Sequence, residues 1–211
     1  MDPNETEVLT LRVLLTGATG FIGSETLRQL VDRPDVSRVT CLARRPVPVD
    51  SDKVESLVLD NFDVYNSEVV DRLAGHDACI WALGSRVAPG GDKVLHHRLT
   101  VDYPIAFVDA LPPGDFRFCY VSGWGTKPKS VKGRAEIALR EFGAQRPGMD
   151  VFCFRPAKVL PQGTNALVRA LYGSLSVGVD VLAQAMIRVA LDEPAETPEV
   201  IENKQIRTLG R

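Results

Sequence analysis

Short apolar runs alternate with longer amphipathic segments over the first three quarters of the chain. The apolar runs have the length of buried strands, and the segments between them have helical spacing. The predicted strands cover residues 12–16, 38–43, 54–59, 78–82, 116–121 and 150–154, and the predicted helices cover residues 21–32, 66–73, 92–110 and 131–145. This alternation predicts an α/β fold with a doubly wound parallel sheet, whose strands are buried on both faces.

The pattern changes in the last quarter of the chain. Two helices are predicted over residues 164–172 and 179–191, followed by a short apolar stretch at 199–201 and a helical turn. This tail is too short to fold alone. We therefore expect one Rossmann-like domain over residues 1–211, in which residues 163–211 form a small helical cap. Ligands bind at the carboxyl edge of open α/β sheets, so the cap would wall in a substrate pocket there.

A glycine-rich turn joins the first predicted strand to the first predicted helix. Residues 17–23 read Gly-Ala-Thr-Gly-Phe-Ile-Gly, with glycines at Gly17, Gly20 and Gly23. Glycines permit a sharp turn and let a pyrophosphate approach without a Cβ atom in the way. The N–H groups and the positive dipole end of the next helix then face the phosphates. The context predicts a dinucleotide site, with a purely structural turn as the alternative.

Two arginines, Arg44 and Arg45, follow the second predicted strand. An NAD site usually places Asp or Glu here to bind the ribose 2′-hydroxyl, yet no carboxylate occurs from Val36 to Pro46. Guanidinium groups at this position suit the 2′-phosphate of NADP. The sequence therefore favours NADP(H), with a pair of solvated arginines as the alternative.

Other strand ends carry further candidates for cofactor contacts. Asp60 and Asn61 follow the third strand, where they could bind the adenine amine or serve a turn. Leu83 and Gly84 follow the fourth strand, and the glycine would let the backbone approach the cofactor ribose.

Ser122 and Lys132 are the candidate catalytic residues. Ser122 directly follows the fifth strand, where a hydroxyl can donate to a substrate carbonyl oxygen. Lys132 begins the next helix and could hold the nicotinamide ribose hydroxyls. The alternatives are that Ser122 is an ordinary serine at a strand end and that Lys132 is a lysine exposed to solvent.

Composition and charge narrow the classes of function. The formal net charge is -2, which does not favour nucleic acid as a partner. No apolar run approaches the roughly 20 residues of a membrane span, and the first residues are acidic and polar, unlike a secretory signal. We therefore expect a cytoplasmic protein that binds a small-molecule substrate.

The four cysteines predict buried thiols. Each lies in an apolar, strand-like segment, and none has a histidine at ligand spacing. Cysteines in such segments ordinarily pack as small hydrophobic residues, so neither a metal nor a disulfide is expected. The four are Cys41, Cys79, Cys119 and Cys153.

Together these motifs resemble the short-chain dehydrogenase/reductase superfamily, and within it the atypical branch that contains the Tat-interacting tumour-suppressor oxidoreductase. The resemblance covers nearly the whole chain and rests on residues 17–23, 39–45, 75–77, 83–84, 131–133, 154–156 and 202–210. It implies an NADPH-binding fold. It also implies cofactor contacts at Thr19, Gly20, Phe21 and Ile22 for the phosphates, Arg44 and Arg45 for the 2′-phosphate, and Leu83, Gly84, Lys132, Arg155 and Pro156 for the ribose or nicotinamide.

One position departs from the superfamily pattern. The general acid of these enzymes is a tyrosine four residues before the active-site lysine, and Pro128 stands there in this chain. The loop before Lys132 is also short and carries Trp124. The resemblance therefore implies an NADPH-dependent oxidoreductase of carbonyl or enone reductase type with another route of proton delivery. A non-redox enzyme (isomerase, lyase or cyclase) and a non-catalytic NADPH-binding regulator are the alternatives.

Overall fold

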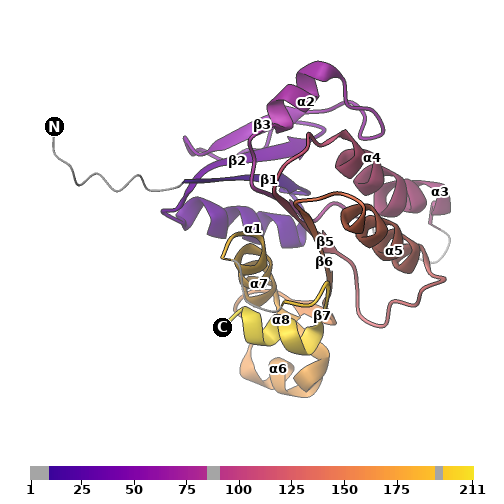
Figure 1. Ribbon diagram of the computed structural model, residues 1–211. Coiled ribbons are helices and arrows are strands. Elements are labelled where there is room, and N and C mark those ends of the chain that lie inside the picture. The colour runs from indigo at the N-terminus through magenta and orange to yellow at the C-terminus, as the bar shows by residue number, and fades with distance from the viewer. Residues whose placement is uncertain (1–9, 85–90, 193–196) are drawn as a thin grey trace.

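A parallel sheet organises the residues that the structure describes. The computed structural model describes residues 10–84, 91–192 and 197–211, and within them seven strands pair in the order β3-β2-β1-β4-β5-β6-β9 (Figure 1). The strands are β1 (Leu11–Thr16), β2 (Val36–Ala43), β3 (Val54–Val58), β4 (Ala78–Trp81), β5 (Phe116–Val121), β6 (Met149–Arg155) and β9 (Val200–Glu202). The order reverses between β1 and β4, and open α/β sheets bind ligands at such a switch point.

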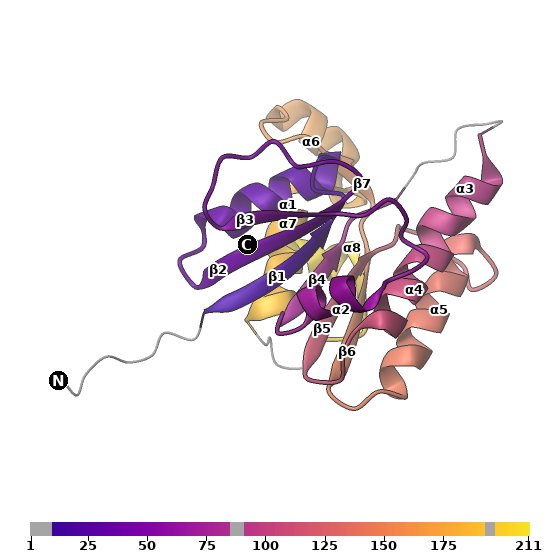
Figure 2. The ribbon, with the colours of Figure 1, turned by 90° about the horizontal axis from the view of Figure 1, so that it is seen from above.

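Helices cover both faces of the sheet (Figure 2). They are α1 (Phe21–Asp32), α2 (Ser67–Leu73), α3 (Lys93–His97), the π-helical turn η1 (Arg98–Asp102), α4 (Tyr103–Ala110), α5 (Val131–Ala144), α6 (Ala166–Tyr172), the 3-10 turn η2 (Gly173–Leu175), α7 (Val179–Leu191) and α8 (Asn203–Leu209). Strand residues alternate between the two layers. Val13 and Leu15 join the core of α1 and α7, whereas Leu14 joins the core of α4 and α5. The predicted fold class is confirmed.

The predicted helix over residues 92–110 forms, but a π-helical turn, η1, interrupts it. Pro104 lacks the N–H group that a regular helix would direct to the carbonyl of Thr100. The hydroxyl of Tyr120, on β5, donates to that carbonyl instead, at 3.0 Å. The proline therefore gives a physical reason for the interruption, and the freed carbonyl ties this helical layer to the sheet.

The tail that the sequence predicts as a cap also builds the body of the fold. α7 packs against α1 and the sheet, and β9 adds a strand beside β6. A separate small sheet of β7 (Lys158–Leu160) and β8 (Ser176–Gly178) was not predicted, because strands of three residues leave no periodic signal. α6 lies outside these layers (Figure 1). That the tail caps a substrate pocket stays a prediction, and α6 is the part of the tail that is placed to do so.

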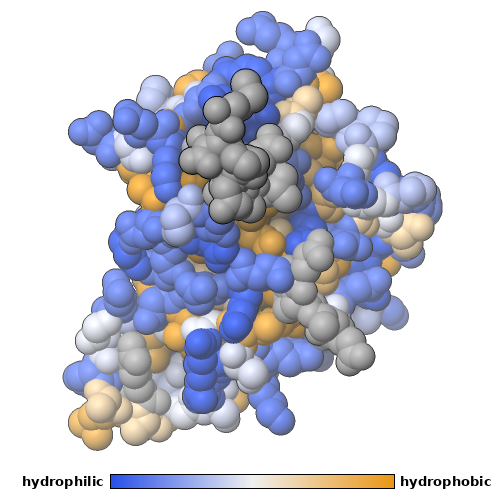
Figure 3. Space-filling view, turned by 60° about the vertical axis from the view of Figure 1, so that its left-hand side comes forward, coloured by the Kyte–Doolittle hydropathy of each residue, from blue (hydrophilic) through white to orange (hydrophobic). Residues whose placement is uncertain are grey.

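α6 exposes two large apolar side chains. Leu167 and Leu171 are 81% and 80% exposed. The face shown in Figure 3 is mostly hydrophilic, with apolar surface between the polar residues and at its lower end. In the part of the chain that the structure describes, no helix combines the length and the apolar character needed to cross a bilayer.

The four cysteines are buried and form no disulfides, which confirms the predicted buried thiols. Burial raises the pKa of Cys41 and of Cys153 to about 12. These thiols are therefore protonated at neutral pH, and a protonated thiol is a poor nucleophile.

His76 links the loop before β4 to β2 and is buried. Its Nδ1 lies 3.0 Å from the carbonyl oxygen of Leu73, and its Nε2 lies 2.9 Å from the hydroxyl of Thr40. Because a carbonyl only accepts, Nδ1 carries the proton and Nε2 accepts from the threonine. Burial in this neutral form lowers the pKa of His76 below its ordinary value of 6.5.

The His76 environment predicts a loss of stability below pH 6.5. Below this pH, His76 binds a proton in the unfolded chain more readily than in the folded chain. The free energy of unfolding therefore falls by at most about 1.4 kcal/mol per pH unit. Above pH 6.5 the neutral His76 makes its full contribution to the free energy of unfolding. Urea unfolding between pH 7 and pH 5 checks it, and His76→Gln should flatten the slope. An equal slope in both proteins would contradict this role.

Candidate nicotinamide-cofactor site

The glycine turn after β1 is packed too closely for side chains. Gly17 has a φ of 69°, and a Cβ atom there would lie 2.7 Å from the carbonyl oxygen of Ala82. A Cβ atom on Gly23 would lie 2.0 Å from the carbonyl oxygen of Gly17. Both glycines therefore have a packing role, which brings the first turn of α1 against the ends of β1 and β4.

The amino end of α1 fits a phosphate group. Gly20 is the residue before the helix, and no side chain in the described part of the chain caps the N–H groups of the first turn. These N–H groups and the helix dipole form a site for an anion. Gly20, Phe21 and Ile22 line a pocket of about 480 Å³, so the phosphates of a dinucleotide can reach them. Thr19 is exposed beside them.

The pocket lies at the carboxyl ends of the central strands. Its lining includes the predicted residues Leu83, Gly84, Ser122, Lys132 and Pro156, together with Thr100, Tyr120, Gly123, Ala157, Lys158 and Val159, which the sequence reasoning did not assign. The structure thus brings candidates from β4, β5, β6 and α5 to the glycine turn. Parallel strands explain this, because their carboxyl ends share one edge.

Ser122 is held at the end of β5. It is 3% exposed, and its N–H donates to the carbonyl of Phe154 at 2.8 Å. Its Oγ lies 3.3 Å from the hydroxyl of Thr126, which itself donates to the carbonyl of Gly123 at 2.7 Å. Thr126 has only one proton to donate, so Ser122 is the donor of the pair.

Lys132 is fixed to the same strand end. The hydroxyl of Ser130 accepts from the N–H of Gly133 at 3.1 Å and caps α5, which sets Lys132 in the first turn. The Lys132 Nζ donates to the carbonyl of Ser122 at 2.5 Å. The two predicted catalytic residues are therefore in direct contact.

The region around Gly84 is open. The N–H of Leu83 donates to the hydroxyl of Thr16 at 3.1 Å, which joins the ends of β4 and β1. A Cβ atom built on Gly84 meets no atom of the described residues within 4 Å. This space and the bare end of α1 lie in one pocket, as a dinucleotide requires.

The candidates on β2 and β3 lie outside the pocket lining. Arg44 and Arg45 are exposed directly after β2, whose Leu42 is aligned with Thr16 of β1. Asp60 and Asn61 are exposed after β3, and the Asn61 side chain accepts from the N–H of Asp63 at 2.8 Å. The structure shows a turn role for this asparagine.

Arg155 takes part in an ion-pair network. Its Nε donates to Glu136 of α5 at 3.0 Å, and its Nη1 donates to Glu202 of β9 at 2.9 Å. The side chain of Glu136 is 4% exposed. Arg155 does not line the pocket, although the next residue, Pro156, does. The guanidinium joins three elements of the fold.

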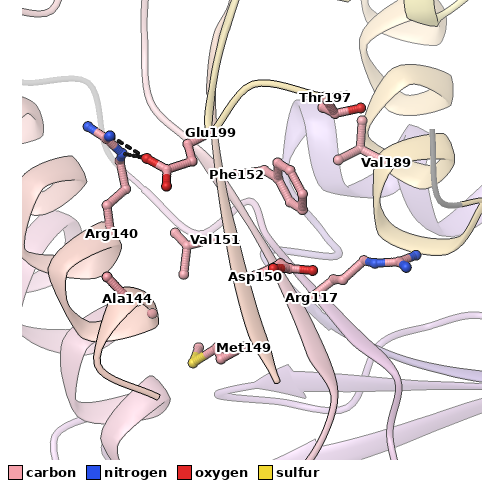
Figure 4. Close-up of a pocket in the computed structure, with 11 residues that line it drawn as sticks. Arg117, Arg140, Ala144, Met149, Asp150, Val151, Phe152, Val189, Thr197 and Glu199 are labelled. Carbon is pink, nitrogen blue, oxygen red and sulfur yellow. Dashed lines mark hydrogen bonds and ion pairs between the residues drawn. The ribbon is translucent and has the colours of Figure 1, made fainter. Parts of the chain in front are cut away.

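A second cavity, of about 650 Å³, lies at the other end of the sheet (Figure 4). It is lined by the first half of β6, by α5 and by Glu199, which forms an ion pair with Arg140. Open α/β sheets bind their ligands at the carboxyl ends of the strands. We therefore place the candidate site at the smaller pocket.

Comparison with known proteins decides the family. A family model described as NAD(P)H-binding matches residues 17–143, from the glycine turn into α5. The chain belongs to the NAD(P)H-binding family. The match confirms the nicotinamide cofactor that the glycine turn predicts.

Individual relatives extend over different parts of the chain. Protein HTATIP2 of Rattus norvegicus is 26% identical over 94% of this chain and 89% of its own length. Leucinostatins biosynthesis cluster protein T of Purpureocillium lilacinum is 27% identical, and the matched part covers 61% of this chain and about half (51%) of that protein. The sequence resemblance stated above is confirmed.

Solved structures show the same fold. The reductase domain of PhqB from Penicillium fellutanum superposes with a TM-score of 0.67 at 20% identity. The superposition covers 91% of this chain and 66% of that one. At this identity the likeness concerns the fold.

Gly84→Val is expected to weaken NADPH binding without destabilising the protein. The valine would occupy pocket space that no protein atom fills. We expect the dissociation constant to rise at least about tenfold, equivalent to about 1.4 kcal/mol. Cofactor fluorescence measures the binding, and thermal unfolding is the control, which should be unchanged. Undiminished binding would place the cofactor elsewhere.

Proposed function

We propose that this protein is an NADPH-dependent oxidoreductase that reduces a carbonyl or enone group, with proton delivery from a group other than the usual tyrosine. The observation that carries the proposal is the convergence of Ser122, Lys132 and the bare end of α1 in one pocket. The likeness to the reductase domain of PhqB supports reduction over the non-redox alternatives.

The side chains have distinct roles in this proposal. The N–H groups of Phe21 and Ile22 bind the pyrophosphate, and the Lys132 ammonium binds the nicotinamide ribose hydroxyls. A bound reduced nicotinamide supplies a hydride. Ser122 then redirects its hydroxyl proton from Thr126 to the substrate oxygen, where negative charge develops. The backbone N–H of Ser122 donates to the carbonyl of Phe154, which keeps the backbone in place. Only the serine hydroxyl therefore changes its partner.

Arg44 and Arg45 support NADP(H) over NAD(H). They are exposed at the end of β2, beside the glycine turn, where the 2′-phosphate of NADP lies in this fold. A hydrogen bond to a charged group contributes about 1.5–3 kcal/mol. Loss of one such contact corresponds to a tenfold or greater loss of affinity.

Ser122→Ala is expected to lower kcat by about 10²-fold, the effect of removing one donor to a developing oxyanion. The dissociation constant of NADPH should be unchanged, because the serine hydroxyl contacts the substrate. NADPH oxidation with a panel of aldehydes and enones measures kcat. Ser37→Ala, a serine at the opposite end of the sheet, is the control. An unchanged kcat in Ser122→Ala would contradict this role.

Arg44→Ala and Arg45→Ala are expected to raise the dissociation constant of NADPH by about tenfold or more each. The dissociation constant of NADH should remain the same, because NADH lacks the 2′-phosphate. Parallel fluorescence titrations measure both. The control is Arg140→Ala, which removes an arginine at the far cavity. Equal losses for both nucleotides would refute the proposed NADP selectivity.

A further inference from the structure

The four tyrosines of the chain differ in whether they can supply a proton to the pocket. Tyr120 lines the pocket, but it is buried, and its hydroxyl donates to the carbonyl of Thr100. Burial also raises its pKa. Tyr103 stacks on Phe62 with the ring centroids 5.6 Å apart. Burial raises the pKa of Tyr65 well above its usual range. Neither Tyr65 nor Tyr103 lines the pocket, and the Tyr120 hydroxyl is already bonded to Thr100.

Tyr172 is different because it contacts a lysine of the pocket. Lys158 follows Pro156 by two residues, lies on β7 and is one of the pocket-lining residues. Its Nζ donates to the Tyr172 hydroxyl at 2.5 Å and lies 4.0 Å from the centroid of the tyrosine ring. Both contacts hold the Lys158 side chain in place. Tyr172 ends α6, so the cap segment fixes a pocket residue.

We propose that Lys158 is the proton donor of this site and that Tyr172 is its positioning residue. The proposal rests on the proposed reductase function and names the group that replaces the missing tyrosine. Ser122 polarises the carbonyl, and Lys132 is bonded to the Ser122 carbonyl. Lys158 is a second ammonium in the same lining, from the side of β7.

The proton and electron balance is complete. As a hydride reaches the carbonyl carbon, the π electrons of the C=O bond move to oxygen. An N–H bond of Lys158 breaks, its electrons remain on nitrogen, and an O–H bond forms on the product. The neutral amine then regains a proton from solvent through the hydroxyl of Tyr172, which is half-buried. In model peptides a lysine ammonium and a tyrosine phenol lose their protons in the same range, near pH 10. An ammonium can therefore take the role of a phenol.

Lys158→Arg separates proton donation from charge. Arginine keeps a positive charge but holds its proton at any working pH. We expect Lys158→Arg and Lys158→Met to lower kcat by about 10²–10⁴-fold, the usual contribution of general acid catalysis. Arginine should keep KM near that of the unmodified protein. The control is Lys129→Met, at an exposed lysine outside the pocket lining.

A labelling measurement tests the Lys158–Tyr172 contact without cofactor or substrate. Acetic anhydride acylates only neutral amines, and peptide mass spectrometry reports the rate at each lysine. Both lysines are exposed, and Lys158 should react more slowly than Lys129 because the hydroxyl and ring of Tyr172 hold its Nζ. Tyr172→Phe should narrow that difference and lower kcat about tenfold. Equal labelling of the two lysines, unaffected by Tyr172→Phe, would overturn the positioning role.

The outcomes separate this inference from the proposed function. Failure of the unmodified protein to bind NADPH or to reduce any carbonyl would refute the reductase function, and the donor role with it. Carbonyl reduction that persists at the full rate in Lys158→Arg would overturn only the donor role. If kcat falls in Lys158→Met but not in Lys158→Arg, the reaction needs the positive charge of the lysine and not its proton. That result would likewise overturn proton donation.

Discussion

The site depends on the contact between the glycine turn and the end of β4. Gly17 lies so close to the Ala82 carbonyl that a methyl group cannot fit, and Gly23 lies even closer to the Gly17 carbonyl. This approach places the first turn of α1 beside Gly84 and Ser122. A longer turn would move the helix end away from the strand ends. The pocket would then lose the N–H groups that suit a phosphate.

Two further interactions hold the strand ends in place. The Tyr120 hydroxyl donates to the Thr100 carbonyl that Pro104 leaves unpaired, which joins η1 to β5. Arg155 joins α5, β6 and β9 through Glu136 and Glu202. Glu136 is almost fully buried, and a buried carboxylate without its partner is strongly destabilising. Arg155 therefore has a structural task whatever its relation to the cofactor.

The sequence predicts the parts of the molecule that follow from local pattern. Strand and helix positions and the glycine turn follow from periodicity and parallel topology, whereas the bond of Lys132 to the Ser122 carbonyl comes from the structure. Lys158 and Tyr172 could not be paired in this way, because β7 is a strand of three residues that leaves no periodic signal to place it beside the predicted helix α6. The partners of Arg155 could not be predicted either, since Glu202 lies 47 positions from Arg155 in the sequence. The π-helical turn becomes predictable only when Tyr120 is known to lie beside Thr100.

The central claim is that the amino end of α1 binds the phosphates of NADPH. Two-dimensional amide NMR of the unmodified protein during addition of NADPH tests it most directly. Saturable shifts of the Phe21, Ile22 and Gly23 amides are predicted, because their N–H groups gain charged acceptors. The amides of Val151 and Phe152, at the far cavity, should remain in place. NADPH that saturates the protein while only the far-cavity amides move would contradict the account.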